Sequence, residues 1–211
     1  GYQRFTGELQ SNKIIQSQLD GKWQMELRYL NRVQGSFYSI DAFTAPVNWY
    51  KGTALVQTGR VKEAIEAFEK AYKAHPYHLG LLNNLASAHF LNSNYEKAEK
   101  YYKEALEISS TYKEVIVNLS MLYARVGKIE RAYTTLMDCD RNRPMPEKYD
   151  DVLIYLLEKK VEKLENKVGN KELKKKLSEL RTQKKKLKDI HDKSIKNGTS
   201  FKEEALLALK R

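Results

Sequence analysis

The side chains that most often carry catalysis or metal binding are few in this chain, and their spacing gives them no obvious partners. There is one cysteine, Cys139, and there are four histidines among the 211 residues. His75 and His78 flank Pro76 and could hold a metal ion together, but a zinc site takes at least three protein ligands. We therefore interpret this pair as turn surface and expect neither a metal nor a cofactor.

Motifs with a defined catalytic mechanism are also missing from the sequence. It contains no G-x-x-x-x-G-K-[ST] phosphate loop, no G-x-G-x-x-G fingerprint, no G-x-S-x-G elbow and no H-E-x-x-H zinc motif. We interpret His89 and Cys139 as packing residues, because both fall at positions of a helical packing pattern described below. We therefore predict that this chain is not an enzyme and that any catalytic part would lie outside it.

The basic charge is concentrated toward the C-terminus. The chain has 38 Lys and Arg against 27 Asp and Glu, and residues 171–188 alone hold 9 basic and 2 acidic residues. Such a stretch can bind a polyanion, either nucleic acid or an anionic membrane surface. It has no aromatic residue to stack on a base and only one arginine, Arg181, so we favour the solvated face of a helix. Polyanion binding is the alternative that we keep for residues 171–188.

The chain has no segment that reads as a membrane span. No apolar run reaches the ~20 residues that a membrane-spanning helix needs, and no signal peptide opens the sequence. Gly1 is followed by Tyr2 without a methionine, which we interpret as the mark of a protease cut. We therefore expect a soluble piece of a longer protein, with membrane contact only through residues outside it.

The strongest signal of organisation is a repeat of 34 residues over 45–146. Four positions recur without a gap: Gly52, Ala86 and Ser120; Ala64, Ala98 and Ala132; Phe68, Tyr102 and Leu136; and Pro76, Ser110 and Pro144. Three more recur at the same spacing: Leu55, His89 and Tyr123; Gly59, Ser93 and Gly127, between the two helices; and Ala71, Ala105 and Cys139. Small residues at the first two positions let two helices approach closely, and the closing proline ends the second helix. Each unit is thus predicted to be a helix hairpin that buries its faces only by stacking on its neighbours.

This pattern resembles the tetratricopeptide-repeat (TPR) family. The resemblance rests on a small residue upstream followed by Ala64-x3-Phe68…Pro76, which returns as Ala98-x3-Tyr102 and Ala132-x3-Leu136…Pro144. It implies an all-α fold, the TPR superhelix, which is a right-handed α-solenoid of helix hairpins. The three units that it implies are 45–78, 79–112 and 113–146, about half of the chain.

Two further regions flank these units. Residues 1–44 are predicted to form a degenerate N-terminal repeat and an ordered loop, because Gly21-x-Trp23 and the leucines after it repeat the second half of the pattern. Residues 147–211 are predicted to form a capping helix, a basic helical hairpin and a short terminal helix that opens at the capping box Ser200-x-x-Glu203.

The C-terminal region carries two apolar stripes with one interruption. The stripes are Leu153, Leu157, Val161, Leu164 and Val168, and then Leu173, Leu177, Leu180, Leu187 and Ile190. Gly169-Asn170 between them suits the end of one helix and the start of the next. We favour an antiparallel coiled-coil hairpin, and one long helix with a weak point at Gly169 is the alternative.

The TPR resemblance also implies where a partner binds, because in this family each unit's first helix lines a concave groove. Carried over position by position, the groove residues are Trp49, Tyr50 and Thr53, then Asn83, Asn84 and Ser87, and then Asn118, Met121 and Arg125. Trp49 and Tyr50 could stack on a ligand, while Asn84 and Asn118 could bracket an extended backbone. For Trp49, packing between repeats or under the N-terminal loop is an equal alternative. We predict a non-catalytic protein-interaction scaffold that binds a peptide, a protein or a glycan polymer.

One kind of TPR partner does not fit this sequence. Members of the family that clamp a C-terminal carboxylate use Lys and Asn in one unit, Asn in the next and two basic residues in the third. Only Asn84 matches this set, and Glu114 stands where a basic residue is needed. Since Glu114 would repel a carboxylate, we do not expect this mode of binding.

A narrower resemblance concerns short stretches of the repeats. Trp49-Tyr50 before Gly52, His75-Pro76-Tyr77-His78 and Asn83-Asn84-Leu85 are similar to the soluble repeat tail of bacterial O-antigen ligase or polymerase-type membrane proteins. This resemblance implies the accessory tail of an envelope glycan ligase on the periplasmic side of a bacterial membrane. Without it we expect a cytoplasmic protein. The sequence makes no prediction of the oligomeric state or of the partner's identity.

Overall fold

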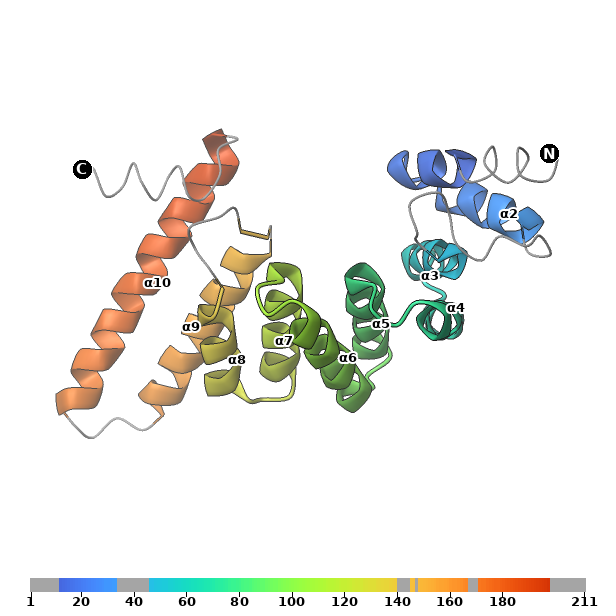
Figure 1. Cartoon of the computed structure of the whole chain (residues 1–211). Helices are drawn as coiled ribbons and strands as arrows, with labels where there is room; N and C mark the ends of the chain where they lie inside the picture. The colour runs from blue at the N-terminus through green and yellow to red at the C-terminus, as the bar shows by residue number, and fades with distance from the viewer. Residues whose placement is uncertain (1–11, 34–45, 140–144, 147, 167–170, 198–211) are drawn as a thin grey trace. The chain divides into compact units, whose positions relative to one another are not determined.

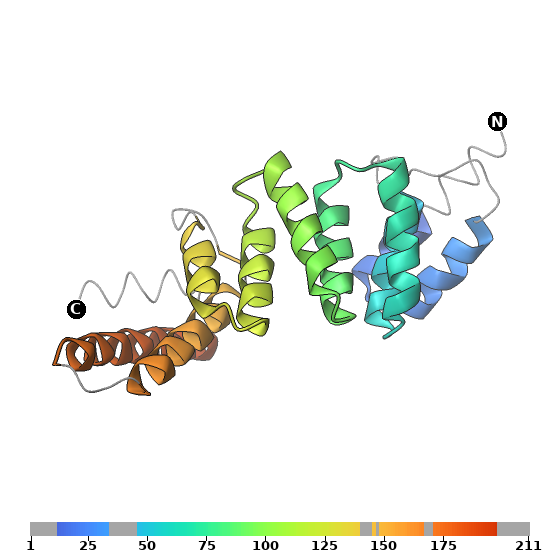
Figure 2. The same cartoon turned by 90° about the horizontal axis from the view of Figure 1, so that it is seen from below.

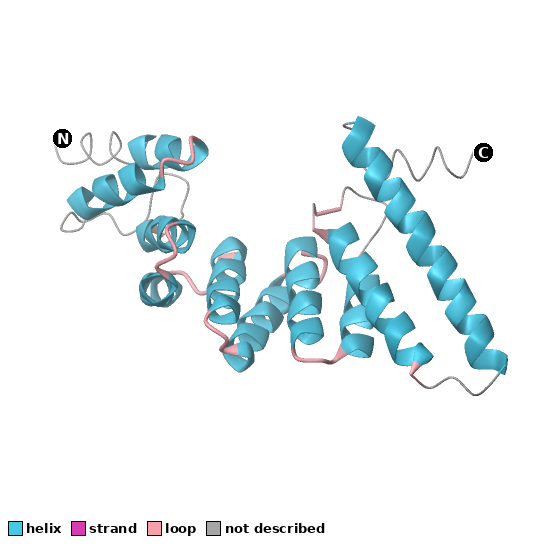
Figure 3. Cartoon of the chain, turned by 180° about the vertical axis from the view of Figure 1, so that it is seen from behind, coloured by secondary structure: helices cyan, strands magenta, loops and turns pink. Residues whose placement is uncertain are grey.

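The computed structural model describes residues 12–33, 46–139, 145–146, 148–166 and 171–197 (Figure 1). Within these ranges the regular secondary structure is α-helical, with no β-strand (Figure 3), which confirms the predicted all-α fold class. The predicted loop at 36–44, the Gly169-Asn170 break and the short helix after Ser200 lie outside the described residues. No helix of the described part is both long and apolar enough to cross a membrane.

The chain divides into two compact units, 1–110 and 111–211. The first unit holds a helical segment at 12–19 and then α2 (Trp23–Val33), α3 (Val47–Gln57), α4 (Val61–Ala74), α5 (Leu79–Leu91) and α6 (Tyr95–Ile108). Helix α3 packs on α4 and α5 on α6, while α4 also packs on α5 and α2 on α3. Successive helix hairpins therefore cover one another's apolar faces, as the repeat predicts.

Left-handed residues end the first helix of each hairpin. Gly59 after α3 has φ +77°, and Ser93 at the equivalent place after α5 has φ +59°. Glycine takes this conformation without a steric penalty, whereas in serine the Cβ makes it unfavourable. The next residue, Asn94, offsets part of that cost because its side chain accepts a hydrogen bond of 3.3 Å from the backbone N–H of Lys97 at the start of α6.

The small residues of the repeat lie where the two helices of a hairpin cross. Ala64, Ala86 and Ala98 are fully buried. At Gly52 on α3, a Cβ would lie 2.3 Å from the Phe68 ring of α4, so no side chain fits between these helices. The burial of these positions agrees with the 34-residue register.

His89 on α5 is a core residue of the first unit, as predicted. The residue is 2% exposed, and its ring is stacked on Tyr101 of α6 with the centroids 5.6 Å apart. Burial lowers the pKa of the imidazole, nearby Lys97 lowers it further, and Glu69 opposes them. The Glu69 carboxylate lies 4.0 Å from His89 Nε2 and 3.9 Å from Lys97 Nζ, and neither ring nitrogen has a hydrogen-bond partner in the described structure.

A second buried titratable group lies in the N-terminal hairpin, which consists of the helical segment at 12–19 and α2. Glu26 on α2 is fully buried, and neither of its carboxylate oxygens has a hydrogen-bond partner in the described structure. Burial raises the pKa of this carboxyl to about 8, so its protonated form predominates at neutral pH. The unfolded chain releases this proton near the ordinary pKa of 4.5, so Glu26 makes stability fall as the pH rises from about 4.5 to about 8.

The second unit holds α7 (Lys113–Arg125), α8 (Ile129–Met137), α9 (Tyr149–Glu165) and α10 (Lys171–Asn197). Helix α7 forms a hairpin with α8, and α9 packs on α7, α8 and α10. The turn between α7 and α8 uses Gly127 at φ +78°. On α7, buried Ser120 donates a 2.8 Å hydrogen bond to the Ala132 carbonyl oxygen of α8.

Helices α9 and α10 form an antiparallel hairpin rather than one long helix (Figure 2). Arg181 pairs with Glu165, and Lys184 Nζ lies 2.8 Å from Glu158 Oε1. The later residue of α10 thus pairs with the earlier residue of α9, as in an antiparallel pair of helices. The buried face of α9 is wider than the narrow seam that was predicted. It includes Leu156 as well as Leu157, because α9 packs on α7 and α8 besides α10.

We expect Gly52→Ala to lower the free energy of unfolding by roughly 1–3 kcal/mol, because its Cβ would force apart α3 and the Phe68 ring. Gly80→Ala in the first turn of α5 is the matched control, since its Cβ would meet only side-chain atoms at 3.2 Å and beyond. It should leave stability within about 1 kcal/mol of the wild type. Chemical denaturation measures both, and equal effects would contradict the close approach at Gly52.

The buried imidazole predicts a pH dependence of stability. Because the pKa of His89 is lower in the folded chain, the unfolded chain binds more protons below the ordinary value of 6.5, and stability should fall as the pH drops below it. His89→Leu places at this position the residue type of Leu55 in the preceding repeat and should make that fall shallower. Denaturant titrations at a series of pH values test this. Parallel profiles for the two proteins would show that His89 does not titrate on unfolding.

Candidate functional site

A small polar hollow lies between the first helices of two successive repeats. Its volume is about 110 Å³. It is lined by Thr53, Val56 and Gln57 of α3, Phe68 of α4, and Asn84, Ser87 and Ala88 of α5. All of these residues belong to the first unit. The structure thus brings together three of the predicted groove residues, Thr53, Asn84 and Ser87.

The polar groups of the hollow are only partly used by the fold. The Thr53 hydroxyl donates to the Trp49 carbonyl oxygen at 3.0 Å, so it can accept from the Asn84 amide nitrogen, which lies 3.4 Å away. That long contact leaves the Asn84 carboxamide with an acceptor oxygen and a further N–H for a ligand. A side chain that offers both a donor and an acceptor matches the alternating groups of a peptide backbone.

Ser87 is held in place from the second helix of its own hairpin. Its hydroxyl shares a 2.9 Å hydrogen bond with the Tyr102 hydroxyl of α6. Burial raises the pKa of Tyr102 to about 12, against a smaller opposing effect of the Ser87 hydrogen bond, so the phenol stays neutral. The repeat pattern alone predicts only packing for Tyr102. The feature of the sequence that could have indicated a polar role is the hydroxyl of Tyr102, which Phe68 and Leu136 lack at the same repeat position.

Trp49 and Tyr50 lie in an apolar cluster. Tyr50 is 7% exposed and packs with Ile14 and Leu30 of the N-terminal hairpin, and half-buried Trp49 joins the same cluster. The Trp49 ring also lies 5.0 Å from that of Tyr50 and 5.1 Å from that of His78. These contacts agree with the packing alternative for Trp49, and stacking on a ligand stays a prediction.

The remaining predicted groove residues lie outside the hollow. Asn83 is half-buried on α5 and already has an interaction partner. In the second unit, Asn118 and Met121 are half-buried and Arg125 is exposed. Their spacing of three and four residues puts these three on one side of α7. Asn84 and Asn118 belong to different units, so a continuous groove between them stays a prediction.

The described residues give little support for metal chemistry in this region. No group of three or more His, Cys, Asp or Glu residues lies together in the part of the chain that the structure describes. His78 is occupied as the cap of α5, since its Nδ1 accepts a 3.0 Å hydrogen bond from the Leu81 backbone N–H. What the hollow offers is neutral hydrogen-bonding groups beside apolar ones, which is the chemistry of recognition.

Comparisons with known proteins agree with this description of the fold. Residues 51–113, from α3 to the start of α7, match the family model of the tetratricopeptide repeat. A MamA RS-1 double mutant superposes with a TM-score of 0.66 at 16% identity, over 89% of this chain and 97% of that chain. A crystal structure of MamA protein gives a TM-score of 0.65 at 14% identity, over 89% and 94%.

A thermophilic TPR protein of Thermus thermophilus gives a TM-score of 0.57 at 14% identity, over 82% of this chain and 99% of that chain. At such identities the similarity shows the fold alone. The chain therefore has the fold of tetratricopeptide-repeat solenoids, and the family match supports the sequence resemblance over 51–113. The matched family and these structures do not support the resemblance to O-antigen ligase tails, which stays a prediction from the sequence.

The different settings of Trp49 and Asn84 predict different effects on stability. Trp49→Ala should lower the free energy of unfolding by roughly 2–4 kcal/mol, because it empties part of the cluster with Tyr50. Asn84→Ala removes one long hydrogen bond and should cost less than about 1 kcal/mol. Thermal or denaturant unfolding of both variants measures this difference. A larger loss for Asn84→Ala would mean that the amide serves the core instead of a ligand.

Proposed function

We propose that this chain is a non-catalytic protein-interaction scaffold and that the hollow between α3 and α5 anchors an extended peptide. The observation that carries this proposal is the convergence of Thr53, Asn84 and Ser87 on one hollow. Repeat solenoids bind partners along the surface that successive units present together, and these residues come from two successive units.

The size and lining of the hollow favour one residue of a longer partner. A volume of about 110 Å³ is well below the several hundred Å³ typical of small-molecule sites. Val56 and Phe68 offer apolar contact, while the Asn84 amide offers hydrogen bonds to the backbone on either side. We therefore propose that a small apolar or hydroxyl-bearing side chain enters the hollow and that the Asn84 carboxamide binds the adjoining peptide group.

Three further parts of the hypothesis concern the extent of the groove, the class of ligand and the cellular setting. Asn118, Met121 and Arg125 of α7 would contact a later part of the same peptide if the groove is continuous. A glycan polymer is the second class of ligand, because hydroxyl groups would also pair with Asn84 and Thr53. The accessory tail of a bacterial envelope ligase would present such a groove in the periplasm, and hydrophobic spans encoded upstream of Gly1 would favour that setting.

A peptide selected against the intact chain tests the proposal. We would select from a random dodecapeptide phage library and measure the affinity of the best synthetic peptide by calorimetry. Asn84→Ala with Thr53→Val should weaken binding by roughly tenfold to a hundredfold, because two hydrogen-bonding groups are lost. The matched control is Asn92→Ala, an exposed asparagine just after α5, which should bind like the wild type.

The same measurement separates the possible outcomes. Equal affinities for the wild type and the Asn84–Thr53 variant would place the peptide elsewhere and overturn the assignment of the hollow. Loss of binding in the Asn92 control as well would point to a general change in α5. A further decrease with Asn118→Ala would support the continuous groove, and no change with it would confine the site to the first unit.

A further inference from the structure

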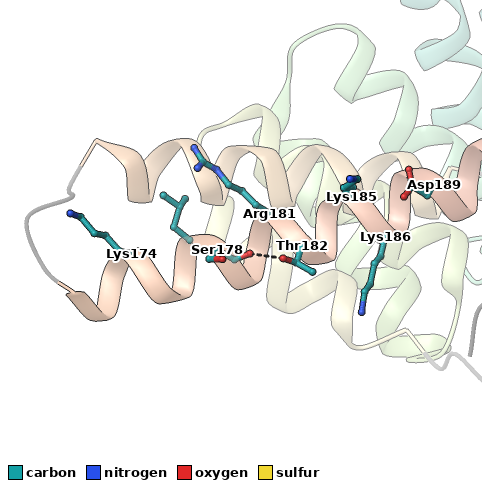
Figure 4. A pocket seen from close by; sticks show the side chains of 8 residues that line it. Lys174, Ser178, Arg181, Thr182, Lys185, Lys186 and Asp189 are labelled. Carbon is teal, nitrogen blue, oxygen red and sulfur yellow. Dashed lines mark hydrogen bonds between the residues drawn. The ribbon is translucent and has the colours of Figure 1, made fainter.

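One side of α10 carries a row of lysines that the hairpin does not use. We call Lys171, Lys174, Lys175, Lys185, Lys186 and Lys193 the outer lysine face. All six side chains are exposed. Their spacing puts them within about a third of the helix circumference, on the side opposite buried Leu177 and Leu180. Figure 4 shows Lys174, Lys185 and Lys186 along this stretch of α10, with Ser178 and Thr182 between them.

Three acidic residues of α9 are paired with cations outside the outer lysine face. Glu165 pairs with Arg181, and Glu158 pairs with Lys184 at 2.8 Å. Glu162 pairs with Lys159 of its own helix at 2.7 Å. These pairs use basic residues outside the outer lysine face, so they leave its charge in place.

Two acids share the side of the outer lysine face, and they do not cancel it. Asp189 and Asp192 lie toward its C-terminal end, where both are exposed. The six lysines exceed these two aspartates by four charges, and the same side also carries exposed Lys196, Ser178 and Thr182. The cationic part of the lining of a hollow of about 710 Å³ along α10 is Lys174, Arg181, Lys185 and Lys186.

We propose that the outer lysine face docks this chain on an anionic phospholipid surface. Charge complementarity carries the inference, since lysines clustered on one side of a helix attract the phosphate and carboxylate groups of acidic lipids. From Lys171 to Lys193 the row extends for about 33 Å at 1.5 Å per residue. A straight helix can keep such a row against a flat surface along its whole length. This inference does not depend on the hollow between α3 and α5.

A lipid surface fits the chemistry of this face better than a nucleic acid does. Single-stranded nucleic acid is held by stacking of its bases on aromatic rings, and α10 has no Phe, Tyr or Trp. The one guanidinium of the helix, on Arg181, is paired with Glu165, so bidentate recognition of phosphate would have to break that pair. The phosphates of duplex DNA curve around the helix axis, whereas the lysines of α10 form a straight row.

Vesicle flotation with the intact chain tests the proposal. The probes are phosphatidylcholine vesicles with and without phosphatidylserine, at salt concentrations from about 50 to 200 mM. The wild type should float only with phosphatidylserine, and binding should fall steeply as salt rises. Changing Lys174, Lys175, Lys185 and Lys186 together to Gln should weaken binding at low salt by a hundredfold or more, at about fivefold per lysine.

Two variants serve as controls. Changing Lys62, Lys70, Lys73 and Lys128 together to Gln removes the same charge from sites outside α10 and should retain most of the binding. Changing the four lysines of α10 to Arg keeps the charge and should also preserve it. Circular dichroism of each variant checks that the helices are intact.

Each other outcome would overturn the proposal. Equal losses in the two Gln variants would show that net charge alone is responsible, and equal flotation with both vesicle types would show that lipid charge is not recognised. An absence of flotation at the lowest salt would exclude the surface. Tighter binding to a duplex DNA probe than to vesicles, lost in the α10 Gln variant, would reassign the face to nucleic acid.

Discussion

The close approach of α3 and α4 at Gly52 is the constraint on which the first unit depends. A Cβ at this position would overlap the Phe68 ring, so the two helices can reach this distance only with glycine. Phe68 also lines the hollow that holds Thr53 and Asn84. A change that separates these helices would therefore alter the candidate site without touching its polar groups. The core of the hairpin and the site share one side chain.

Polar groups inside the repeats show how much departure from an ideal core this fold tolerates. Tyr102 and Ser120 are buried and their hydroxyls are hydrogen-bonded, so their desolvation is largely offset. His89 and Glu26 are buried, and their side chains have no hydrogen-bond partners in the described structure. Burial favours the neutral form of each, so it lowers the pKa of His89 and raises the pKa of Glu26. The two hydroxyl groups stay neutral at any pH near neutrality. His89 lowers stability as the pH falls, whereas Glu26 lowers stability as the pH rises.

The repeat could be predicted from the sequence because its spacing is local and regular. A 34-residue period fixes which residues are small and buried, so Ala64, Ala98 and the turn at Ser93 fall where expected. The choice between packing and ligand stacking for Trp49 could not be made in this way. Its neighbours Ile14 and Leu30 belong to a hairpin with only a degenerate pattern, and the sequence could not show that this hairpin covers α3.

Neighbouring helices also explain why α9 differs from the expected coiled-coil seam. A helix that meets one partner needs one narrow apolar stripe, but α9 meets three helices and buries Leu156 in addition to Leu157. Its acidic residues then lie at the margins of that wide face, where Glu158 and Glu165 meet Lys184 and Arg181. Packing thus determines which cations of α10 are neutralised. The lysines that α9 does not reach keep their charge, and they lie on the opposite side of the helix from the core.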